Sequence, residues 1–199
     1  IGNVEAVEVL LEHGADVNNI NATNDTSPLI ASLQKAYKFN PNRIIIANLL
    51  IASGADINYR DRGGNGDNAV TAAIIPLTSN DPETEKIEQY DFVVGLIDKG
   101  ANFEINCDYG NILAKAAAYN NELLTNYLVN IVGIDINIVD LNNYSPLMYA
   151  VKYEALDTVR NLVFLGATLT VTSNEGKTAI DIAYENNNSE IIDILNGEA

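Results

Sequence analysis

The sequence is poor in the residue types that most often form covalent cross-links and catalytic sites. It has one cysteine, Cys107, and one histidine, His13, in 199 residues. A lone cysteine excludes a disulfide bond within the chain, and neither residue has a neighbouring Cys or His for a metal site or a nucleophile–base pair. We therefore expect a non-enzyme with no catalytic residue, no cofactor and no metal. His13 stands at an expected helix C-terminus, where an imidazole suits the helix dipole.

Basic residues are also scarce, since 11 Lys and Arg stand against 27 Asp and Glu and give a formal charge of −16. A field of this sign repels nucleic acid and anionic membranes and favours a basic partner, although an acidic surface can also serve solubility alone. No run of about 18 apolar residues is present, so we expect no membrane span. The single cysteine leaves the compartment open; we favour the cytoplasm, with secretion as the alternative.

The residues from Gly133 to Gly166 have the pattern of two short helices joined by a turn. Ser145 is a good N-cap and Pro146 fits the first helical position, so the first helix is expected to run from there to about Tyr153. The second helix is expected to end at about Leu165, before a glycine. Two short helices cannot bury an apolar face alone, so this unit needs similar neighbours.

Such neighbours recur along the chain, and the last two intervals between helix-ending glycines are both 33 residues. Related segments (GADVN, GADIN, GANFE, GIDIN and GATLT) begin at Gly14, Gly54, Gly100, Gly133 and Gly166. Helix starts recur at Ser27-Pro28, Asn68-Ala69, Asn111 or Ile112, Ser145-Pro146 and Thr178-Ala179. Apolar pairs precede the glycines and are expected in the core between units: Leu10-Leu11, Leu50-Ile51, Leu96-Ile97 and Leu162-Val163. The self-similarity predicts a repeat architecture.

These motifs make the chain resemble the ankyrin repeat family, whose first helices start with a Thr-Pro-Leu-His pattern. Here the pattern reads Ser-Pro-Leu-Ile at 27–30 and Ser-Pro-Leu-Met at 145–148. The resemblance implies an all-α ankyrin-repeat solenoid of stacked helix-turn-helix units with short β-turn or hairpin finger loops. The family's histidine is absent, so its hydrogen bonds must be lost or replaced; its positions hold Ile30, Thr71, Met148 and Asp181.

We expect one domain over residues 1–199. It would hold a half-repeat and then about five repeats, with boundaries at 1–18, 19–58, 59–104, 105–137, 138–170 and 171–199. The start lacks a methionine and matches only a second helix, so we expect the native chain to begin earlier, with at least one more helix. The last unit places Asn196 where others have an apolar residue, as suits a terminal cap.

Two insertions, at 37–42 and 77–86, read as longer helix–helix loops, the second with an extra helical turn after Pro82. They either join a binding site or are structural decoration.

The resemblance implies a non-catalytic module that binds a partner protein through its concave face, which the finger tips and first helices form. The residues at these positions are Tyr109, Asn111, Tyr119, Leu141, Asn142, Tyr144, Lys152, Tyr153, Asn174, Glu175 and Lys177. Tyrosine offers a large contact area at a low entropy cost, so Tyr109, Tyr119, Tyr144 and Tyr153 are the preferred candidates. The alternative for each tyrosine is that it packs over its neighbour.

We expect the partner to be a protein, and a basic one if charge complementarity with this acidic chain determines binding. We expect the chain itself to be a monomer. Two other functions remain open from the sequence. The chain could be a regulatory or inhibitory subunit of an enzyme or toxin, which it would control by covering its surface. It could also be the interaction domain of a longer enzyme, whose catalytic part would lie before residue 1.

Overall fold

The computed structural model describes residues 3–34, 42–61, 66–76, 83–104 and 109–197. It divides into two compact units, the first made of Ile1–Ile75 with Pro82–Phe103 and the second of Pro76–Asp81 with Glu104–Ala199. Residues 37–41 and 77–82 of the two insertions lie outside the described residues, as does Cys107. The single continuous domain expected from the sequence stays a prediction.

The first unit contains five helices in its described part. They are α1 (Val4–Glu12), α2 (Pro28–Leu33), α3 (Arg43–Ala52), α4 (Ala69–Ala73) and α5 (Glu83–Asp98). Helix α2 packs on α3 and α4 on α5, as expected for helix pairs, and α1 packs against α3. Helix α5 starts directly after Pro82 and is 16 residues long, which confirms the extra helical turn predicted there. An isolated β-bridge joins Asn21 to Thr26 in the loop before α2.

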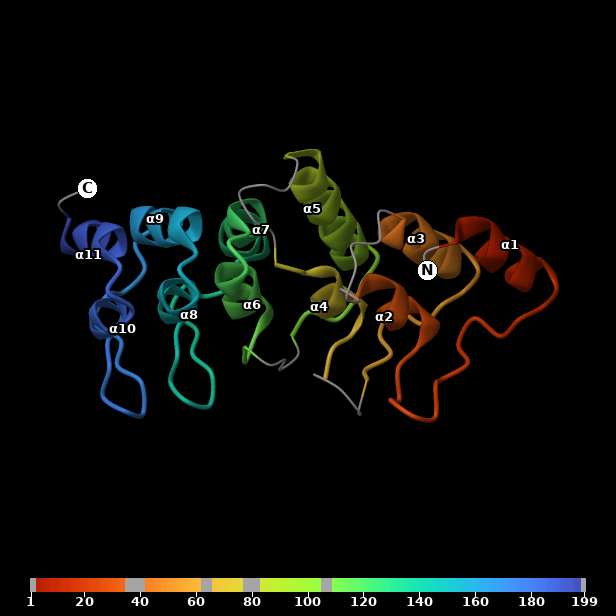
Figure 1. Cartoon of the computed structure of the whole chain (residues 1–199), viewed down its shortest axis with the longest axis horizontal. Coiled ribbons are helices and arrows are strands. Elements are labelled where there is room, and N and C mark those ends of the chain that lie inside the picture. The colour runs from red at the N-terminus through yellow and green to blue at the C-terminus, as the bar shows by residue number, and fades with distance from the viewer. Residues whose placement is uncertain (1–2, 35–41, 62–65, 77–82, 105–108, 198–199) are drawn as a thin grey trace. The chain divides into compact units, whose positions relative to one another are not determined.

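The described part of the second unit contains three helix pairs. They are α6 (Ile112–Ala118) with α7 (Glu122–Tyr127), α8 (Pro146–Lys152) with α9 (Leu156–Phe164), and α10 (Ala179–Asn186) with α11 (Ser189–Asn196). Figure 1 shows α6, α8 and α10 in one row and α7, α9 and α11 in another. The loops before α8 and α10 extend from the first row (Figure 1). The predicted all-α arrangement of stacked helix pairs is confirmed within each unit.

The first helices begin where the caps predict. The Ser145 hydroxyl accepts from the Met148 backbone N–H, with Pro146 in the first turn. In the repeat that begins with α6, where the sequence left two candidates, Asn111 is the cap and accepts from the Ala114 N–H at 2.8 Å. Each cap satisfies one of the N–H groups that have no partner inside the helix. The sequence therefore located the first helices to within about one residue.

A short polar side chain replaces the lost family histidine at two of its four positions, and at a third the Met148 sulfur accepts from the Ser145 N–H at 3.5 Å. The Asp181 carboxylate accepts from the Thr178 backbone N–H at 2.8 Å, and the Thr71 hydroxyl accepts from the Asn68 N–H at 3.1 Å. Both are reciprocal capping boxes, because the N-cap side chain also binds the N3 backbone. Short polar side chains at these positions thus accept from the N-cap backbone N–H at the start of α4 and of α10.

Three of the five related segments, at 14–18, 54–58 and 133–137, share one set of polar contacts. In the segment after α7, the Asp135 carboxylate accepts from the Asn137 backbone N–H at 2.9 Å, which is an Asx turn. The turn aims the Asn137 side chain at the next repeat, where it accepts from the Thr168 N–H at 2.8 Å. Asn18 has the same role, because its side-chain oxygen accepts from the Asp56 backbone N–H at 2.8 Å. These aspartates are therefore structural.

Two local features differ from the sequence predictions. Leu10 was placed in the core, but its side chain is 60% exposed, because α1 packs mainly on α3 and buries no residue fully. The second helix of the repeat that begins with α6 is also irregular, since its last turn, Leu128–Val132, is a π-helix. The left-handed Asn120 and Gly133 that bracket this helix are one residue further apart than Glu154 and Gly166. A π turn absorbs the extra residue.

Candidate functional site

Five tyrosines of the second unit gather beside α6 and α8. Tyr109 and Tyr119 flank α6, Tyr144 precedes α8, and Tyr149 and Tyr153 lie on one side of α8. Residues four apart share a helix face, which places the last two rings together. We call this set the tyrosine cluster. All members except Tyr153 pack with the buried Ala114 and Ala118 of α6, whose small side chains leave room for the rings; the members are Tyr109, Tyr119, Tyr144, Tyr149 and Tyr153.

Tyr109 lies at the centre of the tyrosine cluster. Its ring meets those of Tyr119, Tyr149 and Tyr153 edge-on, with centroids 5.2, 5.5 and 5.6 Å apart. Tyr149 also lies 5.4 Å from Tyr144 and stacks over Tyr153 at 6.5 Å. Edge-to-face aromatic contacts of this kind stabilise beyond the area they bury. Packing over a neighbour, the alternative considered for each tyrosine, therefore holds for Tyr109, while Tyr153 remains 48% exposed.

The hydroxyl groups of the tyrosine cluster bind one another. The Tyr109 hydroxyl donates to the Tyr119 oxygen at 3.2 Å. Burial raises the pKa of Tyr109 far above its usual value, and the hydrogen bond to Tyr119 raises it further. Because the phenol of Tyr109 stays protonated, the cluster presents hydroxyl groups and no phenolate at this point. Tyr119 accepts through its oxygen, so its own O–H can still donate to a ligand.

Asp140 holds the loop before α8 against the cluster. One carboxylate oxygen accepts from the backbone N–H groups of Asn142 and Tyr144, at 2.9 and 2.7 Å. The other accepts from the Tyr149 hydroxyl at 2.8 Å. Gly110 lies directly against Asp140, since an added Cβ at Gly110 would stand 2.3 Å from the Asp140 Cβ. The loop, α8 and the segment before α6 are thus joined through one carboxylate.

Lys152 lies at the exposed edge of the tyrosine cluster. Its ammonium nitrogen is 5.4 Å from the centre of the Tyr144 ring and 5.8 Å from that of Tyr153. Both distances fall within the range of a cation–π interaction. The rings thereby hold the charge at one place, while the ammonium group keeps its hydrogen-bond donors.

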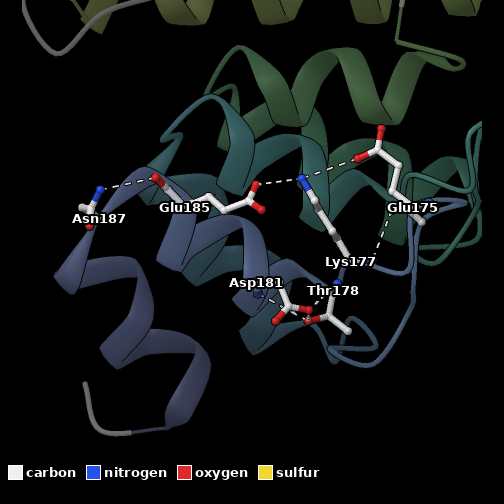
Figure 2. Close-up of polar contacts among 7 residues, drawn as sticks. Glu175, Lys177, Thr178, Asp181, Glu185 and Asn187 are labelled. Atoms are coloured by element: carbon white, nitrogen blue, oxygen red, sulfur yellow. Dashed lines mark hydrogen bonds and ion pairs between the residues drawn. The ribbon is translucent and has the colours of Figure 1, made fainter.

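The candidate residues of the last loop form a separate polar group. Lys177 pairs with Glu185 at 3.0 Å and with Glu175 at 3.5 Å, as Figure 2 shows. The hydrogen bond to Glu185 raises the pKa of Lys177. Asn174 ties this loop to the preceding one, because its side chain donates to the Leu141 carbonyl and its N–H to that of Asn142, both at 3.0 Å. The two loops are therefore linked by their backbones.

Ring and cation–π contacts bring together five of the eleven candidates named from the sequence: Tyr109, Tyr119, Tyr144, Lys152 and Tyr153. A sixth, Leu141, is 92% exposed in the loop that carries Tyr144. Asn111 caps α6, Asn142 bonds weakly to Asp140 at 3.5 Å, and the remaining three lie in the polar group of the last loop: Asn174, Glu175 and Lys177. These eleven residues remain candidates for partner contact.

Sequence reasoning missed Tyr149, Asp140 and Glu185. Tyr149 stands four residues before Tyr153, and this spacing could have identified it. Asp140 and Glu185 give no comparable signal, because carboxylates are abundant here and only the folded loop shows what they bind. His13, by contrast, lies as expected at the end of α1, with its Nδ1 2.7 Å from the Val9 carbonyl oxygen.

Within the described ranges, no group of three or more His, Cys, Asp or Glu residues is placed to hold a metal ion. Among the helices in those ranges, none has the length and apolar character needed to cross a membrane.

Stacked helix pairs with a Gly-Ala-Asp turn and a Ser-Pro-Leu helix start define a helical repeat protein. The comparisons with known proteins agree. A three-copy ankyrin repeat model matches residues 85–173, and a single ankyrin repeat model matches residues 1–25. The chain belongs to the ankyrin repeat family. Ankyrin repeats are generally protein–protein interaction modules and are typically non-catalytic.

Viral proteins are among the relatives of this chain. FPV031 of fowlpox virus (strain NVSL) is 27% identical over 162 residues, which cover 77% of this chain and 44% of that protein. The ankyrin repeat protein OPG189 of vaccinia virus (strain Western Reserve) is 26% identical over 195 residues, or 98% of this chain and 31% of that protein. The chain therefore spans less than half the length of these relatives.

Proposed function

We propose that the second unit binds a partner protein through the tyrosine cluster and the loop tip beside it. The observation that carries this proposal is a set of five tyrosine rings linked by ring contacts through Tyr109 and Tyr149, with Tyr153 at its exposed edge. Tyrosine is enriched at the energetic centres of protein interfaces because it combines a rigid apolar ring with a hydrogen-bonding hydroxyl.

The cluster is also ordered before any partner arrives. Tyr109 is fixed by three ring contacts and Tyr149 by its bond to Asp140. Side chains that are already fixed lose little conformational entropy when they bind, which leaves more of the contact energy for affinity. Leu141, 92% exposed in the loop that carries Tyr144, adds an apolar contact point.

Site-specific photo-cross-linking tests this proposal. A benzophenone amino acid replaces Tyr153 in one variant and Tyr184 in a control, and each protein is irradiated in extract of the native host. Tyr184 is a fair control because it is 56% exposed on α10 and stands outside the tyrosine cluster. We expect a discrete cross-linked protein from position 153 that is absent or much weaker from position 184. Equal labelling from both positions, or none from position 153 while position 184 labels, would contradict the proposal.

A further inference from the structure

We infer that the segment of the partner that meets Lys152 is acidic, with an Asp or Glu carboxylate beside an apolar side chain. The carboxylate binds the Lys152 ammonium, and the apolar side chain packs on the exposed Tyr153 ring. This inference rests on the proposed binding role of the tyrosine cluster and names the chemistry of what binds there.

The first step is the state of Lys152. Its ammonium lies over the rings of Tyr144 and Tyr153 and its side chain is exposed. Across the residues that the structure describes, no carboxylate lies within ion-pair distance of it. Lys177 shows the opposite arrangement, since Glu175 and Glu185 both bind its ammonium. Lys152 thus offers a positive charge that the described part of its own unit does not pair with a carboxylate.

The second step is the state of the nearby acids. Asp140 is engaged by three donors, Glu175 and Glu185 share Lys177, and Asp181 accepts from Thr178 (Figure 2). These acids keep their charge, but their oxygens are already bonded inside the unit, which leaves fewer acceptor sites for an incoming cation. The acids named here are therefore engaged while Lys152 is not, in a chain whose formal charge is −16.

The third step is hydrogen bonding. The Tyr119 oxygen accepts from Tyr109, so the Tyr119 O–H is left to donate to another group. An ammonium and a phenolic O–H are both donors, and a carboxylate is a pure acceptor with room for several donors. Remote acidic residues oppose such a ligand only weakly, because salt screens charges beyond about 8 to 10 Å. Contact chemistry at this surface therefore favours an anion.

One nearby group acts against the inference and supplies a control. Glu154 follows Tyr153, is exposed, and has no hydrogen bond or ion pair from its carboxylate in the described part of the chain. Its charge repels a partner carboxylate. A Glu154→Gln variant should therefore bind an acidic segment more tightly than the original protein does.

The test uses a phage-displayed library of random 12-residue peptides selected on the immobilised 199-residue protein. Enriched peptides are synthesised with a fluorescent label, and their dissociation constants are measured by anisotropy. The variants are Lys152→Met, Glu154→Gln, Tyr153→Ala and Lys99→Met. Lys99 lies in the first unit and is exposed, so its variant has the same change in total charge away from the cluster.

We expect enriched peptides with an Asp or Glu beside an apolar residue. Lys152→Met, or replacing that peptide acid by its amide, should weaken binding roughly threefold to fivefold, as for an exposed ion pair. Glu154→Gln should strengthen it and Lys99→Met should leave it within twofold. Peptides that need Tyr153 but lack an acid, or that ignore Lys152→Met, would overturn the inference alone. An unselective library, or peptides indifferent to Tyr153→Ala, would overturn the proposed binding role as well.

Discussion

The Tyr149 hydroxyl donates a 2.8 Å hydrogen bond to the Asp140 carboxylate, whose other oxygen accepts from the backbone of the loop before α8. We predict that Asp140→Ala lowers the free energy of unfolding by about 1 to 3 kcal/mol, because it removes a charged acceptor from three donors. Urea denaturation measures the loss. Asp193→Ala, at an exposed position of α11, should change stability by less than about 0.5 kcal/mol. Equal effects of the two substitutions would contradict this role of Asp140.

Two glycines with similar φ angles provide a test of the close approach between Gly110 and Asp140. Gly110 has φ +80° and Gly176 has φ +76°, but only Gly110 faces another residue at close range, the Cβ of Asp140. Gly176→Ala should cost about 1 to 2 kcal/mol, the penalty of a side chain in the left-handed region. Gly110→Ala should cost clearly more, because the loop before α8 must also move. Thermal and urea unfolding of both variants measure the difference, and similar losses would argue against the close approach.

The asparagine contacts between repeats predict a smaller effect. Asn137→Ala removes the acceptor of the Thr168 N–H at 2.8 Å but keeps the Asp135 turn, which uses the backbone. We expect a loss of about 0.5 to 1.5 kcal/mol in the free energy of unfolding. Asn130→Ala, exposed on the π turn, is the matched control and should lie within about 0.5 kcal/mol of the original. Protection of the Thr168 amide from hydrogen exchange should fall in Asn137→Ala only, and unchanged protection would refute the contact.

The capping box of α10 predicts a pH effect. The Thr178 hydroxyl and N–H bind Asp181, at 2.6 and 2.8 Å, and hold its pKa below the ordinary 3.8. A lowered folded-state pKa means that the ionised carboxylate stabilises the fold above the unfolded pKa. This contribution is lost as the pH falls through the folded pKa. Thr178→Val removes the hydroxyl, so an NMR titration should show the pKa of Asp181 moving back up. An unchanged pKa in this variant would contradict the assignment.

The repeat framework could be predicted from the sequence because it depends on local signals. Ser145 and Pro146 start α8, and Gly166 ends α9 with φ +86°. Caps and left-handed glycines act through the nearest few backbone groups, so their residue types are sufficient to locate them. The extra turn of α5 after Pro82 was predictable for the same reason.

The features that the sequence did not predict depend on contacts between residues far apart in the chain. The π turn at Leu128–Val132 follows from one extra residue between two left-handed positions, which an equal spacing of glycines concealed. Leu10 has the pattern of a core residue, but its exposure depends on what packs against α1. Four of the five tyrosines of the cluster were named from the sequence as single candidates, and the centre at Tyr109 became visible only when the rings of two repeats met.

The most direct test of protein binding through the tyrosine cluster is the affinity of the partner captured by cross-linking at position 153. Calorimetry compares the original protein with Tyr119→Ala/Tyr153→Ala and with Tyr184→Ala, after circular dichroism has shown that all three are folded. We predict that the double variant binds at least about tenfold more weakly, as for residues at the centre of an interface, and that Tyr184→Ala binds as the original does. Unchanged affinity in a folded double variant would contradict the account.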